Sequence, residues 1–134
     1  MQSLEIRTPE RNVFVDITAQ LNDAVAAEGV RDGVLVVAVP HTTAGITINE
    51  NADPSVRKDM LMALDRLVPE TLPFTHAEGN SDAHVKASLV GNSVTVPLSG
   101  GRLKLGTWQG VYFCEFDGPR RRRVDVVALP AQRS

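Results

Sequence analysis

Short apolar segments of strand length recur along this chain, and they restrict it to a fold rich in β-sheet. Residues 4–6 and 13–17 alternate apolar with polar side chains, which is the period-2 pattern of half-buried strands. We expect these two strands to form a hairpin that turns at residues 9–12. Residues 33–39 are almost all apolar, so this strand is expected to be covered on both faces.

Helices are expected between these strands, because apolar side chains recur there at helical spacing. Thr18 is placed to cap the first helix, and Gly29 is placed to end it in the left-handed conformation. Asp53 and Pro54 begin a second helix with an acidic cap and a proline in the first turn. A third, shorter helix is expected at residues 81–89.

The C-terminal third of the chain reads as further strands. They are expected at residues 93–98, 102–105, 107–116 and 123–129, joined by turns that contain glycine, and together they would form an antiparallel meander. A chain of 134 residues is long enough for one hydrophobic core. The expected fold is therefore a single α+β domain that spans residues 1–134.

The charge balance argues against nucleic acids and membranes as partners. The formal net charge is −2 at pH 7, which provides no global field for a polyanion. Four arginines at residues 120–123 are flanked by acids, and we interpret them as a solvated turn or a salt-bridge cluster between subunits. No apolar run approaches the roughly 20 residues of a membrane-spanning helix, and no signal-peptide pattern is present. The only cysteine, Cys114, lies in an apolar strand where we expect it to be buried, and these features favour the cytoplasm.

Polar residues that follow the apolar run at 33–39 are the first candidates for a functional site. His41, Thr42 and Thr43 open a loop, and the two threonines offer donors suited to a phosphate or a carboxylate. The alternative is a turn whose threonines bond locally. Glu50 and Asn51 precede the second helix without an evident structural duty. They are therefore candidates for a ligand, a general base or a hydrogen bond to substrate.

The loop expected at residues 69–80 leads into the densest polar segment, which supplies His76, Asp82 and His84. All three histidines of the chain lie in polar, loop-adjacent segments, and this favours a shared site over three independent buried histidines. Three imidazoles suit zinc with an open water position. They equally suit a phosphate, as cations, or proton transfer, because free imidazole titrates near pH ~6.5.

A glycine-rich segment further along offers a second set of polar groups. Arg102 and Lys104 are two residues apart, so on a strand they share one face. Trp108 and Gln109 follow, between glycines. Such a face suits an anionic ligand with a ring stacked on the indole, and the alternative is a solvated basic face beside a core tryptophan.

Three long blocks of the chain resemble the signature blocks of the YjbQ family. They are HTTAGITINENAD at residues 41–53, EGNSDAHVKASLVG at residues 78–91 and GRLKLGTWQGVYFCEFDGPR at residues 101–120. Blocks of this length in this order are much more specific than any short motif. The resemblance implies a sandwich of mostly antiparallel sheet with two to three packed helices, assembled as a homotrimer.

The resemblance also implies a function. Members of that family are credited with secondary thiamine-phosphate synthase activity, so the expected protein is an enzyme that acts on a small phosphorylated metabolite. A non-catalytic trimer that binds a metal or a metabolite is the alternative, because no nucleophile and base pair is recognisable.

The residues that match these blocks, or lie beside them, define the expected site. His41, His76 and His84 are the expected ligands of one divalent metal, with zinc the first choice and magnesium the choice for a diphosphate substrate. Glu50, Asp82 and His84 are the expected catalytic residues. The expected substrate-binding residues are Thr42, Thr43, Asn51, Arg102, Lys104, Trp108 and Gln109.

Overall fold

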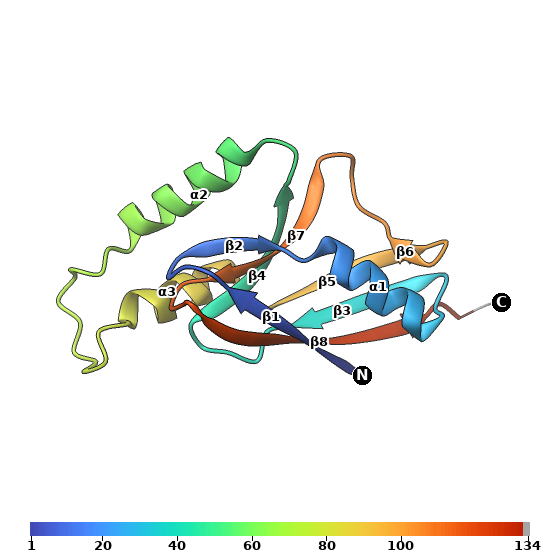
Figure 1. The fold of residues 1–134 in the computed structure, drawn as a ribbon, viewed down its shortest axis with the longest axis horizontal. Helices are drawn as coiled ribbons and strands as arrows, with labels where there is room; N and C mark the ends of the chain where they lie inside the picture. The colour runs from blue at the N-terminus through green and yellow to red at the C-terminus, as the bar shows by residue number, and fades with distance from the viewer. Residues whose placement is uncertain (133–134) are drawn as a thin grey trace.

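Two antiparallel sheets form the body of the protein (Figure 1). The computed structural model describes residues 1–132. The five-stranded sheet has the order β1-β8-β3-β5-β6 and consists of β1 (Gln2–Thr8), β8 (Arg120–Pro130), β3 (Gly33–Ala38), β5 (Ser93–Ser99) and β6 (Arg102–Leu103). The three-stranded sheet has the order β2-β7-β4 and consists of β2 (Val13–Asp16), β7 (Gln109–Glu115) and β4 (Ala44–Glu50).

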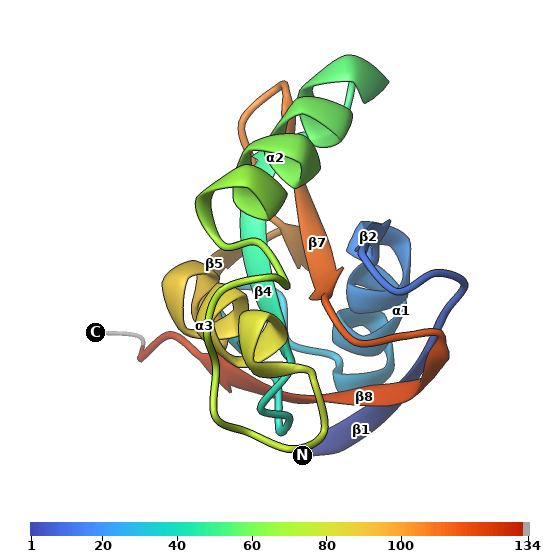
Figure 2. The same cartoon turned by 90° about the vertical axis from the view of Figure 1, so that its left-hand side faces the viewer.

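Three helices pack on this body, namely α1 (Thr18–Glu28), α2 (Pro54–Leu67) and α3 (Ser81–Val90). α1 contributes to the core between the sheets, whereas α2 and α3 cover the outer face of the three-stranded sheet (Figure 2). The expected α+β class, with antiparallel sheets and three helices, is confirmed. Within residues 1–132, none of the helices has the length and apolar character needed to cross a membrane.

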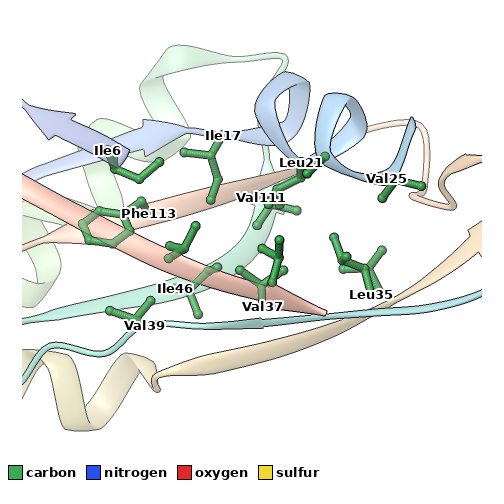
Figure 3. Close-up of a cluster of buried hydrophobic side chains, with 14 of the residues drawn as sticks. Ile6, Ile17, Leu21, Val25, Leu35, Val37, Val39, Ile46, Val111 and Phe113 are labelled. Atoms are coloured by element: carbon green, nitrogen blue, oxygen red, sulfur yellow. The ribbon is translucent and has the colours of Figure 1, made fainter. Parts of the chain in front are cut away.

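The main hydrophobic core lies between the two sheets and is closed on one side by α1 (Figure 3). Leu35 and Val37 enter it from β3, Ile46 from β4 and Phe113 from β7. Leu21 enters it from α1. Because side chains on a strand alternate between its faces, each strand gives every second residue to this core.

β3 is fully covered on one face only. Leu35 and Val37 are buried in the core, whereas Val34 and Val36 point the other way and are partly exposed. The expectation that this strand is covered on both faces is therefore wrong. β7 has that property instead, since residues 110–115, including the predicted buried cysteine, are all buried between the main core and the two outer helices.

The expected strand pairings are wrong in two places, although the strands themselves are present. β1 pairs with β8 and β2 pairs with β7, so residues 9–12 carry the chain from one sheet to the other and do not turn a hairpin. Of the expected meander only β5 and β6 pair with each other, because β7 belongs to the second sheet and β8 returns to the first. Alternation identifies a half-buried strand but does not identify its partner.

The helix ends agree with the sequence in most respects. Asp53 caps α2, with its carboxylate accepting a backbone hydrogen bond from the first turn at 2.9 Å. Gly29 ends α1 in the left-handed conformation, with φ of 72°. Thr18 is not the cap of α1, because Ile17 occupies that position. The Thr18 hydroxyl accepts a hydrogen bond from Val111 N at 2.9 Å and so ties α1 to β7.

Two of the segments that carry the chain from one sheet to the other touch each other, namely residues 9–12 and the turn between β7 and β8. Gly118, in the turn between β7 and β8, donates from its backbone N to Arg11 O at 3.1 Å. A side chain at Gly118 would clash with Glu10 O, so only glycine permits this approach. The close contact brings the turn between β7 and β8 against residues 9–12.

Leu21 tests how far the fold depends on α1. It is 0% exposed, so Leu21→Ala should lower the free energy of unfolding by about 2–5 kcal/mol through lost contacts and a residual cavity. Leu89 lies in α3 and is 62% exposed, so Leu89→Ala is a matched control that should change stability by about 0.5 kcal/mol or less. Urea denaturation followed by circular dichroism measures both, and equal losses would contradict this account of α1.

Candidate functional site

All three histidines of the chain line one open pocket of about 660 Å³, here called the histidine pocket. His41 comes from the turn between β3 and β4, His76 from the segment between α2 and α3, and His84 from α3. The other polar residues of the lining are Thr42, Thr43, Glu78, Asn80, Asp117, Arg120 and Arg122. The pocket therefore lies where β4 begins and where the chain passes from β7 to β8.

His41 is held by the backbone of β8. Its Nε2 accepts a hydrogen bond from Arg123 N at 3.0 Å, so the proton of the neutral ring lies on Nδ1. Burial lowers the pKa of His41 below its ordinary value of 6.5, and the charges of Arg122 and Arg123 lower this pKa as well. His41 is therefore a neutral imidazole at pH 7.

His76 and His84 form an edge-to-face pair in the lining of the pocket. Their ring centroids are 5.7 Å apart and the ring planes meet at 88°. His76 Nε2 also lies 3.8 Å from Glu78 Oε2, an exposed contact that contributes little to stability. Two imidazoles this close, from a loop and a helix, can serve a common proton, anion or metal ion.

A buried ion pair forms the inner wall behind Thr43. Arg122 Nε donates to Glu115 Oε1 at 2.9 Å, and Arg122 Nη2 donates to Thr43 Oγ1 at 2.8 Å. Glu115 also accepts from Thr8 Oγ1 at 2.7 Å and from Asp117 N at 3.0 Å. Burial acts to raise the pKa of Glu115, but the hydrogen bonds from Arg122 and Thr8 outweigh it and lower that pKa. The carboxylate is therefore charged, and the ion pair is intact at neutral pH.

Sequence reasoning missed Arg122 as a functional candidate. The arginines at residues 120–123 form the start of β8 and not a turn, because the strand begins three residues earlier than predicted, although all of them except Arg122 are solvated as expected. Arg122 points inward and is 5% exposed, whereas Arg121 is exposed. The signal was available in the alternation, since Arg122 shares its strand face with the buried Val124 and Val126.

Asp82 is buried in an ion-pair network and does not line the histidine pocket. It accepts hydrogen bonds from Arg11 Nη2 at 3.0 Å and from Lys86 Nζ at 3.2 Å. Lys86 Nζ also donates to Asp65 at 3.2 Å, so the network joins α3 to α2 and to residues 9–12. Burial acts to raise the pKa of Asp82, but the hydrogen bonds from Arg11 and Lys86 outweigh it and lower that pKa. The geometry gives Asp82 the role of fixing the start of α3, two residues before His84.

Glu50 and Asn51 lie at the opposite end of β4 from Thr43. The seven residues of β4 span roughly 20 Å at ~3.3 Å per residue, and neither side chain lines the histidine pocket. Glu50 is instead opposite Gln109 in the ladder between β4 and β7, and Asn51 N donates to Trp108 O at 2.9 Å. These four residues form a second group, in which Glu50 is half-buried and the other three are exposed.

Arg102 and Lys104 lie at the edge of the five-stranded sheet, and both are exposed. Lys104 is held there by a backbone hydrogen bond from its N to Pro97 O at 2.8 Å. Neither side chain lines the histidine pocket. Of the expected substrate-binding residues, the pocket brings only Thr42 and Thr43 to the histidines.

The donor set of the pocket fits a metal ion only in part. In the part of the chain that the structure describes, no three side chains of His, Cys, Asp or Glu gather closely enough to hold one. His76 and His84 are adjacent, but Nε2 of His41 is engaged by Arg123 N. A three-histidine site would need His41 to bind through Nδ1 or to release this hydrogen bond.

Comparison with known proteins gives one consistent result. The family model described as UPF0047 protein YjbQ-like matches residues 2–131. The UPF0047 protein MJ1081 of Methanocaldococcus jannaschii is 57% identical over 122 residues, which cover 91% of this chain and 88% of that protein. The UPF0047 protein YugU of Bacillus subtilis is 51% identical over 123 residues, which cover 91% of this chain and 93% of that protein.

Solved structures agree with these relatives. An uncharacterised conserved protein of the YjbQ/UPF0047 family from Clostridium acetobutylicum superposes with a TM-score of 0.94 at 52% identity, covering 96% of this chain and all of that one. A conserved hypothetical protein from Thermus thermophilus superposes with a TM-score of 0.91 at 43% identity, covering 96% of this chain and all of that one. The sheet order and the arrangement of helices are thus shared with these proteins.

Asp82 tests whether the buried network has a structural role. Asp82→Asn removes the buried carboxylate that pairs with both Arg11 and Lys86 and leaves Lys86 only the exposed Asp65, so it should lower the free energy of unfolding by about 3 kcal/mol. Asp65 also contacts Lys86 but its side chain is 63% exposed, so Asp65→Asn is a matched control with an expected loss of less than about 1 kcal/mol. Urea titrations of both variants at pH 7 measure the difference. Similar losses in the two would contradict the structural role of Asp82.

The same carboxylate gives this effect a pH dependence. The pKa of Asp82 in the folded protein lies below its ordinary value of 3.8, so its contribution is present above that value and is lost as the pH falls through the lower pKa. The loss caused by Asp82→Asn should therefore be constant from pH 5 to pH 7 and shrink below about pH 4. The urea titrations repeated at each pH show whether it does.

Proposed function

Because the chain belongs to the YjbQ-like UPF0047 family, a family of uncharacterised function, we propose a function from the chemistry of the histidine pocket. The protein is a small-molecule enzyme that acts on a phosphorylated metabolite. The observation that carries this proposal is that all three histidines, from three separate elements, line one pocket. Three histidines with separate packing roles would have no physical reason to line the same pocket.

The three imidazoles of the pocket differ in their hydrogen bonding and therefore in the chemistry they can perform. His41 is neutral, and with Nε2 engaged by Arg123 N it has Nδ1–H to donate to a ligand. The rings of His76 and His84 are adjacent. Unlike His41, neither of them forms a hydrogen bond between a ring nitrogen and the backbone of residues 1–132. They are the candidates for passing a proton to or from a substrate.

Thr42 and Thr43 add hydroxyl groups beside His41 in the lining. The Thr43 hydroxyl accepts from Arg122, which leaves its own proton for a ligand oxygen. Such donors suit phosphate oxygens and can stabilise charge on a departing phosphate.

Thiamine-phosphate synthesis is the best named case for this chemistry. In that reaction the methylene carbon that carries the diphosphate of hydroxymethylpyrimidine diphosphate bonds to the nitrogen of a thiazole phosphate, and diphosphate leaves with the electron pair of the broken C–O bond. The enzyme must stabilise the leaving group and exclude water from the cationic pyrimidine. The pocket supports the first requirement through its hydroxyl and imidazole donors.

A homotrimer is part of this proposal. Glu50, Lys104 and Trp108 lie outside the histidine pocket of their own chain, so a role in the same reaction would require a neighbouring subunit to bring them there. The partly exposed face of β3 leaves apolar side chains available for such a contact.

The adjacency of His76 and His84 favours a second candidate, a non-catalytic trimer that binds a metal or metabolite. Zinc would be held by these two imidazoles, and by His41 through Nδ1. Magnesium would instead arrive with a diphosphate substrate, because it binds through phosphate oxygens and retains several waters.

The enzyme proposal is tested by supplying both thiamine precursors and measuring thiamine phosphate by mass spectrometry. Wild-type protein should form the product, and His41→Ala or His84→Ala should lower the rate by about 100-fold or more, through loss of a donor to the leaving group at His41 and of a proton-transfer group at His84. Leu89→Ala, which changes an exposed residue away from the pocket lining, should retain the wild-type rate. Equal rates in all three variants would refute a role for the histidines.

The metal candidate has a separate test that does not depend on activity. Protein loaded with zinc and dialysed should retain one ion per chain, and replacing any one of the three histidines by alanine should lower this occupancy with the circular dichroism spectrum unchanged. Binding should also weaken below about pH 6, as protonation removes the imidazole lone pairs. Full zinc occupancy in the histidine variants would exclude this site.

A further inference from the structure

Arg122 has one donor group that the protein does not use. The side chain lines the histidine pocket although it is 5% exposed. Its Nε and Nη2 donate to Glu115 and Thr43, but Nη1 has no hydrogen-bond partner within residues 1–132. A guanidinium presents five N–H donors, and those of Nη1 are left for whatever enters the pocket.

We infer that Arg122 is the anion-binding residue of the histidine pocket, with Nη1 donating to an oxygen of the substrate's phosphate group. The inference rests on the proposed function, in which this pocket binds a phosphorylated metabolite. In this view Arg122 recognises the phosphate group, whereas the histidines carry out proton transfer, so the two roles can be tested separately.

The surroundings of Arg122 suit this role. Glu115 and Thr43 hold the guanidinium in one orientation by several hydrogen bonds, so little side-chain freedom is lost when a ligand binds. A charge-assisted hydrogen bond from a buried donor is also stronger than one from a solvated donor. Glu115 offsets the charge of Arg122, which allows the guanidinium to be buried at all.

Two other acids in the lining do not oppose an anion strongly. Asp117 Oδ2 accepts hydrogen bonds from Asn80 at 2.9 Å and from Arg120 at 3.3 Å, so its charge is already engaged. Glu78 is exposed, and its charge is screened by solvent and salt. The innermost charge of the lining is therefore that of Arg122.

The test is isothermal titration calorimetry with inorganic phosphate at pH 7, on wild-type protein and four variants. Arg122→Lys keeps a cation beside Glu115 but has a single nitrogen, which cannot bind Glu115 and also replace Nη1 as the donor to phosphate. The dissociation constant for phosphate should therefore rise by about tenfold or more. The double variant Arg122→Met with Glu115→Gln removes both charges, so it leaves no unpaired buried ion and should also lose phosphate binding. Arg121→Met is the matched control, because it removes an exposed cation from the same strand.

Arg121→Met should bind phosphate with the wild-type affinity, which separates a local donor from an effect of net charge. Circular dichroism and thermal unfolding identify any variant that fails to fold, and Arg122→Lys remains informative if the double variant does not fold. Wild-type affinity in the folded Arg122 variants, or no binding of phosphate to wild-type protein, overturns the inference. His84→Ala should still bind phosphate, so failure of the histidine chemistry and failure of the Arg122 site give different results.

Discussion

The ion pair between Arg122 and Glu115 holds the two sheets together at the end where the pocket opens. Arg122 lies in β8 of the five-stranded sheet, and Glu115 ends β7 of the three-stranded sheet. Each partner is further bound, Arg122 to Thr43 and Glu115 to Thr8 and to the backbone of the next turn. A buried ion pair stabilises a fold only when such hydrogen bonds compensate for desolvation. Here they do, and they also set the distance between the sheets at this end.

A second charged network fixes the other wall of the histidine pocket. Asp82 binds Arg11 and Lys86, which ties the beginning of α3 to residues 9–12, one of the segments that cross between the sheets. His84 follows two residues later, so its backbone position depends on this network. The two networks meet through the contact between Gly118 and Arg11. The pocket is therefore bounded by groups whose positions are set before any ligand binds, as a site that stabilises developing charge requires.

The sequence predicts the elements of this fold well and their pairing poorly. The cap at Asp53, the left-handed end at Gly29 and the positions of most strands follow from local chemistry, which is visible in a few neighbouring residues. The pairing of β1 with β8 depends on contacts more than 100 residues apart, and alternation carries no information on such partners.

The candidate site, too, follows only in part from the sequence. The convergence of the histidines was predicted from their polar surroundings, but a buried Arg122 was not, because charged residues are usually taken as exposed. Glu50 and Trp108 were grouped with the histidines through their place in long sequence blocks, yet β4 and β7 carry them to the far end of the sheet.

The deeply buried strand β7 and the exposed segment between α2 and α3 should differ in how readily they unfold. β7 is the central strand of its sheet and is buried on both faces, so its amide protons should exchange with solvent only when the whole fold comes apart. The segment between α2 and α3, by contrast, has almost no buried side chains and can open locally. Local opening would release His76 and leave His41 in place, bound to the backbone of β8. The part of the pocket around His41 is thus as stable as the fold itself, whereas the part that His76 contributes can open without global unfolding.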